Sequence, residues 1–251
     1  GTVSLLPIKP DGSLGKLSHN IQHSGSSVDK DRQEGPHAHS ITLDQNNKYA
    51  LATDLGTDQI ITYKLDKEGN KLTEAGIPPL ATVPGSGPRH LDFHPDGDYV
   101  YVINEINSTI ATYSYDTSTG NLNLLQVVSA LPSSFSGSNT CADIHVSPSG
   151  DFLYGSNRGH DSLVIFSIDP EDRTLTYVGH ESSQGKVAQN FAIDPTGQIL
   201  LVANSEAGTV VTFHIDTQTG RLNPTGHVTA VPAPACVKLM PVSVSVALDV
   251  G

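Results

Sequence analysis

The sequence predicts an all-β fold, a β-propeller of four-stranded antiparallel blades, and three observations support this prediction. Four stretches of the 251-residue chain align with one another at a period near 50 residues. Each stretch carries the same succession of strand and turn patterns, and no long helical pattern interrupts them. Repeats of this length that contain four strands are typical of propeller blades. At this period, 251 residues correspond to about five blades in one domain.

The repeat is visible as aligned sequence. Positions at the start of the apolar strand of each repeat fall 50, 53 and 47 residues apart, at Tyr49, Tyr99, Phe152 and Ile199. The aligned stretches are residues 41–66, 91–116, 144–169 and 191–216.

The second repeat shows the plan of one unit. A first strand leads into the turn 94–97, where proline presets φ and glycine accepts a positive φ. The second strand, 99–103, is almost entirely apolar, as expected for a strand that is buried on both faces. The third strand, 110–115, alternates in character and ends in the polar turn 116–120. A fourth strand follows at 122–125.

The chain is predicted to be one propeller domain over residues 1–251. The four complete blade units are expected at about 37–86, 87–138, 139–186 and 187–232.

The two ends of the chain, 1–24 and 233–251, are predicted to make one composite blade. Residues 1–8 match the third strand of a repeat, and a fourth strand is expected near 16–22. At the other end, 236–239 are spaced like a first strand, and 242–250 alternate like a second strand. Pairing these segments would remove open sheet edges, which otherwise attract further strands.

Charge and composition limit the partners. The chain has 14 Lys and Arg against 26 Asp and Glu, a formal net charge of -12, which argues against nucleic acid and anionic membranes as partners. No apolar run is long enough for a transmembrane helix. Cys141 and Cys236 are too few for a disulfide framework and are expected to be small core residues at the starts of inner strands.

No cofactor is expected, because motifs for zinc, for a phosphate-binding glycine loop and for a serine nucleophile elbow are not present in the sequence. The expected location is the cytoplasm, with secretion as the alternative, and the oligomeric state is open.

Two columns of aligned positions carry the candidate site. The column just before the inner strand holds His39, Arg89, Ala142 and Gln189, and the column just after the buried second strand holds Leu55, Glu105, Arg158 and Ser205. A repeated scaffold does not require different polar residues at equivalent positions. A binding site does, because each blade contributes a different group to one ligand.

Structural roles are the alternative for these residues. Arg89 and Arg158 could instead form ion pairs between blades with Glu105 and Asp143. A third column is uniform in chemistry and is interpreted as turn capping; it holds Asp54, Asn104, Asn157 and Asn204. The minor site candidates are His37, Asp143 and Gln189.

Four short motifs, each at its place in a blade, resemble the lactonase-type β-propeller family. This family includes propeller-type 6-phosphogluconolactonase and carboxy-muconate cyclase. The motifs are GPHAHS at 35–40, GPRH at 87–90, VINE at 102–105 and GSNR at 155–158. The resemblance implies a propeller of seven blades, so a chain with about five is expected to be either a fragment or a shortened propeller that closes with fewer blades.

The resemblance also implies site residues. His39 and Glu105 are the implied catalytic residues, and Arg89 and Arg158 are the implied substrate-binding residues. Gln189 departs from the bacterial members, where arginine is frequent. Two guanidinium groups can clamp a carboxylate or phosphate, and a histidine and a glutamate can transfer protons.

The expected function is a lactonase-like hydrolase that opens a small anionic sugar lactone such as 6-phosphogluconolactone without a metal. Three alternatives remain open. They are a carboxy-muconate lactonising enzyme, a non-catalytic propeller that binds a partner, and a metal-dependent lactonase with Glu105, Asp54 or Asp143 as oxygen ligands.

Overall fold

The structure, a computed structural model, describes residues 1–240, and every regular element among them is a β-strand. The strands form five separate antiparallel sheets. The first sheet has two strands, β1 (Thr2–Leu5) and β2 (His19–Gln22). The second comprises β3 (Ala38–Leu43), β4 (Tyr49–Asp54), β5 (Gln59–Asp66), β6 (Lys71–Glu74) and the short β7 (Leu80–Ala81), which pairs with β5.

The other three sheets have four strands each, joined in chain order. One contains β8 (Pro88–Phe93), β9 (Tyr99–Asn104), β10 (Thr109–Asp116) and β11 (Asn121–Ser129). The next contains β12 (Thr140–Val146), β13 (Phe152–Arg158), β14 (Ser162–Ile168) and β15 (Leu175–Ser182). The last contains β16 (Ala188–Ile193), β17 (Ile199–Asn204), β18 (Thr209–Ile215) and β19 (Leu222–Ala230).

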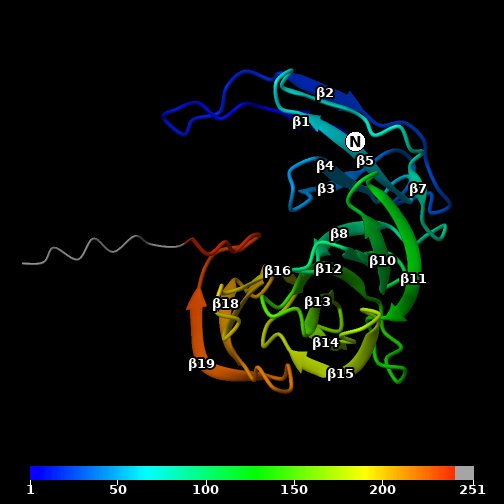
Figure 1. The fold of residues 1–251 in the computed structure, drawn as a ribbon. Helices are drawn as coiled ribbons and strands as arrows, with labels where there is room; N and C mark the ends of the chain where they lie inside the picture. The colour runs from blue at the N-terminus through cyan, green and yellow to red at the C-terminus, as the bar shows by residue number, and fades with distance from the viewer. Residues whose placement is uncertain (241–251) are drawn as a thin grey trace, which may run out of the picture.

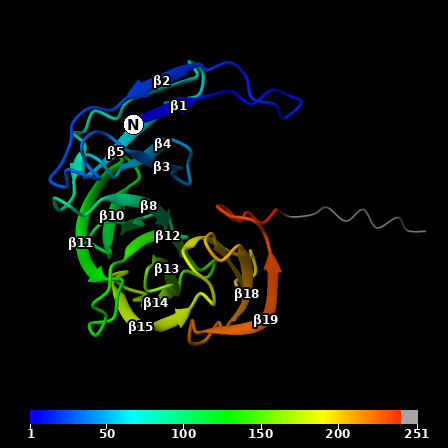
Figure 2. The same ribbon diagram turned by 180° about the vertical axis from the view of Figure 1, so that it is seen from behind.

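The sheets follow one another around an arc, as Figures 1 and 2 show from opposite sides. The first strand of each larger sheet lies at its inner edge, and β3, β8, β12 and β16 contact one another in series. Strands β11, β15 and β19 form the outer rim (Figure 1). The predicted fold class, an all-β propeller with about five blade units, is therefore confirmed.

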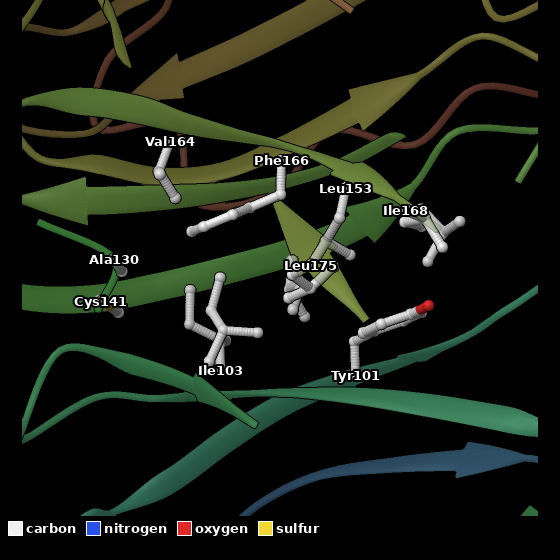
Figure 3. Packing of buried hydrophobic residues seen from close by; sticks show 12 residues of the cluster. Tyr101, Ile103, Ala130, Cys141, Leu153, Val164, Phe166, Ile168 and Leu175 are labelled. Atoms are coloured by element: carbon white, nitrogen blue, oxygen red, sulfur yellow. The ribbon is translucent and has the colours of Figure 1, made fainter. Parts of the chain in front are cut away.

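The core lies between neighbouring sheets. Strand β4 is buried along its whole length, and β13 is buried except for its last residue. Between β9 and the β12–β15 sheet, fully buried Ile103, Leu153 and Val164 pack against Phe166 (Figure 3). The apolar second strands predicted from the sequence are therefore buried because each sheet covers the face of the next.

The predicted turns have the expected backbone geometry. In the turn after β8, Gly97 has a φ of 86° and its N–H donates to the carbonyl of His94 at 2.9 Å. A Cβ at Gly97 would lie 3.0 Å from the Gln45 side chain of the preceding sheet. Glycine is therefore favoured there by the positive φ, and a side chain at this position would also displace the end of Gln45.

The two ends of the chain follow the prediction to different extents, since β1 and β2 form within the segments expected at 1–8 and 16–22. In the described residues, the sheet at the N-terminus consists of β1 and β2 only, and 236–239 form no strand. The expected second strand at 242–250 lies outside the described residues, so the composite blade remains a prediction. In the described part, the first and last sheets do not meet in either view, and the arc is open (Figures 1 and 2).

The expectation for the cysteines is half correct. Cys141 is fully buried in β12, whereas Cys236 is exposed and lies beyond β19, because the strand expected around it does not form. Both thiols are free.

The packing between sheets leads to a first prediction. Leu153→Ala removes a fully buried side chain and should lower the free energy of unfolding by about 2–5 kcal/mol, through lost burial and a residual cavity. Leu125→Ala, at a position 46% exposed in β11, should change it by less than about 0.5 kcal/mol. Urea unfolding followed by circular dichroism measures both values, and equal effects would contradict the proposed packing.

Candidate active site

Each inner strand contains a β-bulge at the same place. The register between inner and second strand shifts at this point in all four larger sheets. The residues without a pairing partner are His39 in β3, Arg89 in β8, Ala142 and Asp143 in β12, and Gln189 in β16. A bulge changes the direction of a side chain and is common beside active sites. The column just before the inner strands therefore corresponds to the bulge residues, which follow one another along the arc.

The second column is held directly beside these bulges. In three sheets, the backbone N–H just after the second strand donates to a carbonyl at the start of the inner strand. The pairs are Leu55 to His37 at 3.0 Å, Glu105 to Gly87 at 2.7 Å and Ser205 to Val187 at 2.9 Å. In the remaining sheet, Arg158 is the last residue of β13 and pairs with Thr140 of β12. The fold therefore brings the two predicted columns together.

Glu105 is the centre of the candidate site. It is buried, and its Oε2 lies 2.8 Å from Arg89 Nε and 2.8 Å from Arg158 Nη2. Its Oε1 accepts a hydrogen bond from Arg32 Nη2, in the loop between β2 and β3. One carboxylate thus binds three guanidinium groups from three separate segments.

The arginines are oriented by further contacts with inner strands. Arg89 Nη1 donates to the Ala142 carbonyl at 2.6 Å. Arg158 Nη2 donates to the Cys141 carbonyl at 2.8 Å, and its Nη1 donates to Gln189 Oε1 at 3.3 Å. Arg89 therefore bridges two sheets, and Arg158 connects its own sheet with those of Glu105 and Gln189.

Three positive charges surround one negative charge, so the cluster carries an excess of two positive charges. Burial by itself raises the pKa of Glu105, but Arg158, Arg32 and Arg89 together lower it below its ordinary value. Glu105 is consequently ionised at neutral pH. Both of its oxygens accept hydrogen bonds from arginines. Glu105 is therefore better suited to orient the arginines as an anion than to donate a proton.

His39 lies beside this cluster on β3. Its ring packs edge-on against the His90 ring, with 5.1 Å between the two ring centroids. Part of the His39 residue reaches solvent, but partial burial of its imidazole, together with the charge of Arg89, lowers its pKa from 6.5 to about 4. The imidazole is therefore neutral at pH 7 and free to accept a proton.

A second polar cluster lies further along the inner strands around buried Asp143. Its Oδ1 lies 2.7 Å from His90 Nδ1, and its Oδ2 lies 3.1 Å from His145 Nε2. Asn190 of β16 also donates to Oδ2. Burial raises the pKa of Asp143 by itself, but the two histidines reverse this, and its pKa lies well below the ordinary value. Burial by itself lowers the pKa of His145, but the carboxylates of Asp143 and Asp92 raise it to about 10.

The structure places the predicted site residues in two polar clusters, and these clusters touch where Arg89 Nη1 lies 3.3 Å from His90 Nε2. Arg89, Glu105 and Arg158 share one cluster, and Gln189 contacts it through Arg158. His39 lies beside this cluster, with its ring against that of His90. Asp143 belongs to the second cluster, so the alternative pairing of an arginine with Asp143 is not formed, while the alternative pairing with Glu105 is.

His37 does not join either cluster. Its exposed ring pairs with Glu34 at 3.1 Å, and only its backbone belongs to the site.

Sequence reasoning missed Arg32 and Asn190. Arg32 lies in a loop outside the repeats, so it has no equivalent position in the other blades with which it could be aligned. Asn190 follows Gln189 directly, and its column neighbours His90 and Asp143 could have identified it as part of a polar ring.

The three carboxylates of the metal-dependent alternative lie in separate environments. Glu105 binds arginines, Asp143 binds histidines, and Asp54 accepts from His23 at 2.6 Å and from backbone N–H groups of the following turn. Within residues 1–240, His, Cys, Asp and Glu side chains form no group of three or more that could hold a metal ion. A carboxylate that already binds three guanidinium groups also has no free oxygen for a cation.

A pocket of about 740 Å³ lies elsewhere, between β2 and strands β5 and β6. It contains none of the predicted site residues. The polar groups buried in its wall satisfy one another, since His23 bridges Asp54 and the Tyr63 hydroxyl at 2.6 and 2.8 Å.

Comparisons with known proteins identify the family of the chain. A family described as "Lactonase, 7-bladed beta-propeller" matches residues 1–239. The chain belongs to this lactonase β-propeller family. It is 38% identical over 240 residues to a protein of Bacillus subtilis (strain 168) named 6-phosphogluconolactonase, covering 96% of the chain and 67% of that protein. A protein of the same name from Formosa agariphila is 39% identical over 196 residues, covering 77% of the chain and 55% of the relative.

Solved structures show the same fold. A structure from Bacteroides fragilis superimposes with a TM-score of 0.89 at 37% identity, covering 96% of the chain and 68% of its own length. The periplasmic gluconolactonase of Pseudomonas aeruginosa gives a TM-score of 0.88 at 33% identity, covering 94% and 65%. The chain thus spans between about half and two thirds of the length of the relatives it matches. Residues 1–240 contain no helix capable of crossing a lipid bilayer.

The arginine cluster leads to a second prediction. Glu105→Gln removes the negative charge between three guanidinium groups, and it should lower the free energy of unfolding by about 3 kcal/mol at pH 7. Glu206→Gln, at an exposed site in the equivalent turn of the last sheet, should change it by less than about 0.5 kcal/mol.

The effect of Glu105→Gln should also depend on pH. Because folding lowers the pKa of Glu105, its contribution is present above its unfolded pKa, about 4.3, and is lost as pH falls through the folded value. The difference between wild type and variant, measured by urea unfolding, should therefore shrink below about pH 4. A difference that stays constant from pH 7 to pH 3 would show that charge is not its source.

Proposed function

We propose that this protein hydrolyses the ring ester of a small anionic sugar lactone such as 6-phosphogluconolactone. The observation that carries the proposal is the excess of two positive charges around Glu105, next to an imidazole that is neutral at pH 7. Positive charge attracts an anionic substrate and stabilises the oxyanion that forms when a lactone carbonyl is attacked. A neutral imidazole can take a proton from water.

The relatives support the same reaction. The B. subtilis and F. agariphila relatives are named for lactone hydrolysis, and so is the P. aeruginosa structure, although those names cover phosphorylated and non-phosphorylated lactones. The family membership therefore supports the reaction class, and the charge of the site supports an anionic substrate.

The proposed reaction has two steps. His39 accepts a proton from a water molecule as the water oxygen bonds to the lactone carbonyl carbon, and the oxyanion that forms lies against an arginine. When the ester bond to the ring oxygen breaks, the imidazolium returns its proton to that oxygen, which becomes the free hydroxyl of the sugar acid.

The arginines and Glu105 have distinct roles in this proposal. Glu105 holds the guanidinium groups in place and keeps their mutual repulsion low. Arg158 is the candidate for contact with the oxyanion, because its side chain is 17% exposed, whereas that of Arg89 is 4% exposed. Arg89 is more deeply buried, and its contacts with Glu105 and β12 suit it to positioning and to general attraction of the anion.

The approach of the substrate also adjusts His39. An anion bound at the arginines compensates the positive charge that helps to lower the His39 pKa. Its pKa should then rise from about 4 towards neutrality, where an imidazole is a stronger base.

The third prediction concerns pH. Activity should fall with decreasing pH as His39 becomes protonated, with an apparent pKa in kcat/KM of about 4, the value in the free protein. His39→Asn should lower kcat at pH 7 by about 100-fold or more, as expected for loss of a general base. Lactone disappearance, corrected for spontaneous hydrolysis, measures both, with the exposed His227→Asn as control. Full activity in His39→Asn would overturn the assignment.

The fourth prediction concerns Arg158. Arg158→Ala should lower kcat/KM for 6-phosphogluconolactone by about 100-fold or more, because it removes an electrostatic contact to the oxyanion. The exposed Arg221→Ala should behave as wild type in the same assay. Turnover that is unchanged in a folded Arg158→Ala protein would contradict the proposed site.

A further inference from the structure

We propose that Arg32 is a specificity-determining residue, and that it favours sugar lactones carrying a phosphate group over neutral ones. This inference rests on the proposed function. It names the residue that would bind the phosphate group, at a distance from the ester that reacts. Arg32 lies outside the repeats and in neither column of the blade alignment.

The loop that carries Arg32 is held rigidly. Asp29 Oδ1 accepts the backbone N–H groups of Asp31 at 2.9 Å and Arg32 at 3.0 Å. The adjacent Gln33 is fully buried, and its Nε2 donates to the Leu55 carbonyl, at the end of β4, at 2.8 Å. These contacts fix the position from which the Arg32 side chain reaches Glu105.

The exposure of the three guanidinium groups increases from the interior towards solvent. The side chain of Arg89 is 4% exposed, that of Arg158 is 17% exposed and that of Arg32 is 46% exposed. Arg32 is therefore the arginine of this cluster that is most accessible to a ligand from solvent.

Arg32 also has donors to spare. Arg89 and Arg158 each donate to a backbone carbonyl as well as contacting Glu105. Within residues 1–240, the Arg32 guanidinium has Glu105 as its single hydrogen-bonding partner. A planar guanidinium with free N–H groups suits a phosphate, which accepts paired hydrogen bonds.

A purely structural role does not account for Arg32. Glu105 is already in contact with two arginines, so a third guanidinium is not needed to neutralise it. Arg32 instead increases the excess positive charge. A phosphate ester carries about 1.5 to 2 negative charges near pH 7, which matches the excess of two.

The experiment compares Arg32→Ala and Arg32→Lys with wild type on 6-phosphogluconolactone and on glucono-1,5-lactone, which differ by the phosphate. In Arg32→Ala, the ratio of kcat/KM for the phosphorylated to the neutral lactone should fall by about tenfold or more, mainly through KM of the phosphorylated substrate. Arg32→Lys, which keeps the charge but not the planar fork, should fall between the two. Arg221→Ala should leave the ratio as in wild type.

A binding measurement separates this inference from the proposed reaction. Titration calorimetry with 6-phosphogluconate and gluconate should show the same tenfold loss of preference for the phosphorylated acid in Arg32→Ala. If the preference falls but wild type hydrolyses neither lactone, the proposed reaction is wrong and the role of Arg32 stands. If wild type shows no preference, or Arg32→Ala keeps the wild-type ratio in both measurements, the role of Arg32 is overturned.

Discussion

The candidate site depends on one buried carboxylate that is shared by three arginines. Without Glu105, the guanidinium groups of Arg32, Arg89 and Arg158 would repel one another in a poorly hydrated place. With it, they are drawn together from a loop, an inner strand and the end of a second strand. The same interaction that joins three segments leaves an excess of positive charge, so the structural contact and the proposed anion site cannot be separated.

The bulges on the inner strands determine which residues can take part. A regular ladder would alternate side chains between the two faces of each strand, where they would pack against neighbouring sheets. The register shift at equivalent places in β3, β8, β12 and β16 releases one or two residues from this alternation. A repeated scaffold thereby provides equivalent positions whose side chains are free to differ, and the blades supply a histidine, an arginine and a glutamine there.

The charge at the candidate site differs in sign from the net charge of the protein. The net charge of -12 is spread over the chain, whereas three arginines are gathered around the single carboxylate of Glu105. A small anion is attracted locally although the protein as a whole is negative. The neighbouring Asp143 cluster also centres on one carboxylate, but its partners are two histidines and an asparagine in place of arginines.

The sequence by itself determined the blade pattern, the buried second strands, the turn glycines and the residues of the two polar columns, because all of these repeat at a period near 50 residues. Only the tertiary structure decided how those residues combine. It showed that Glu105 binds both column arginines, that Asp143 pairs with histidines, that Cys236 is exposed, and that Arg32 joins the cluster. The physical reason is that repeats report positions within a blade, whereas contacts between blades, and those made by loops outside the repeat, depend on packing between segments distant in sequence.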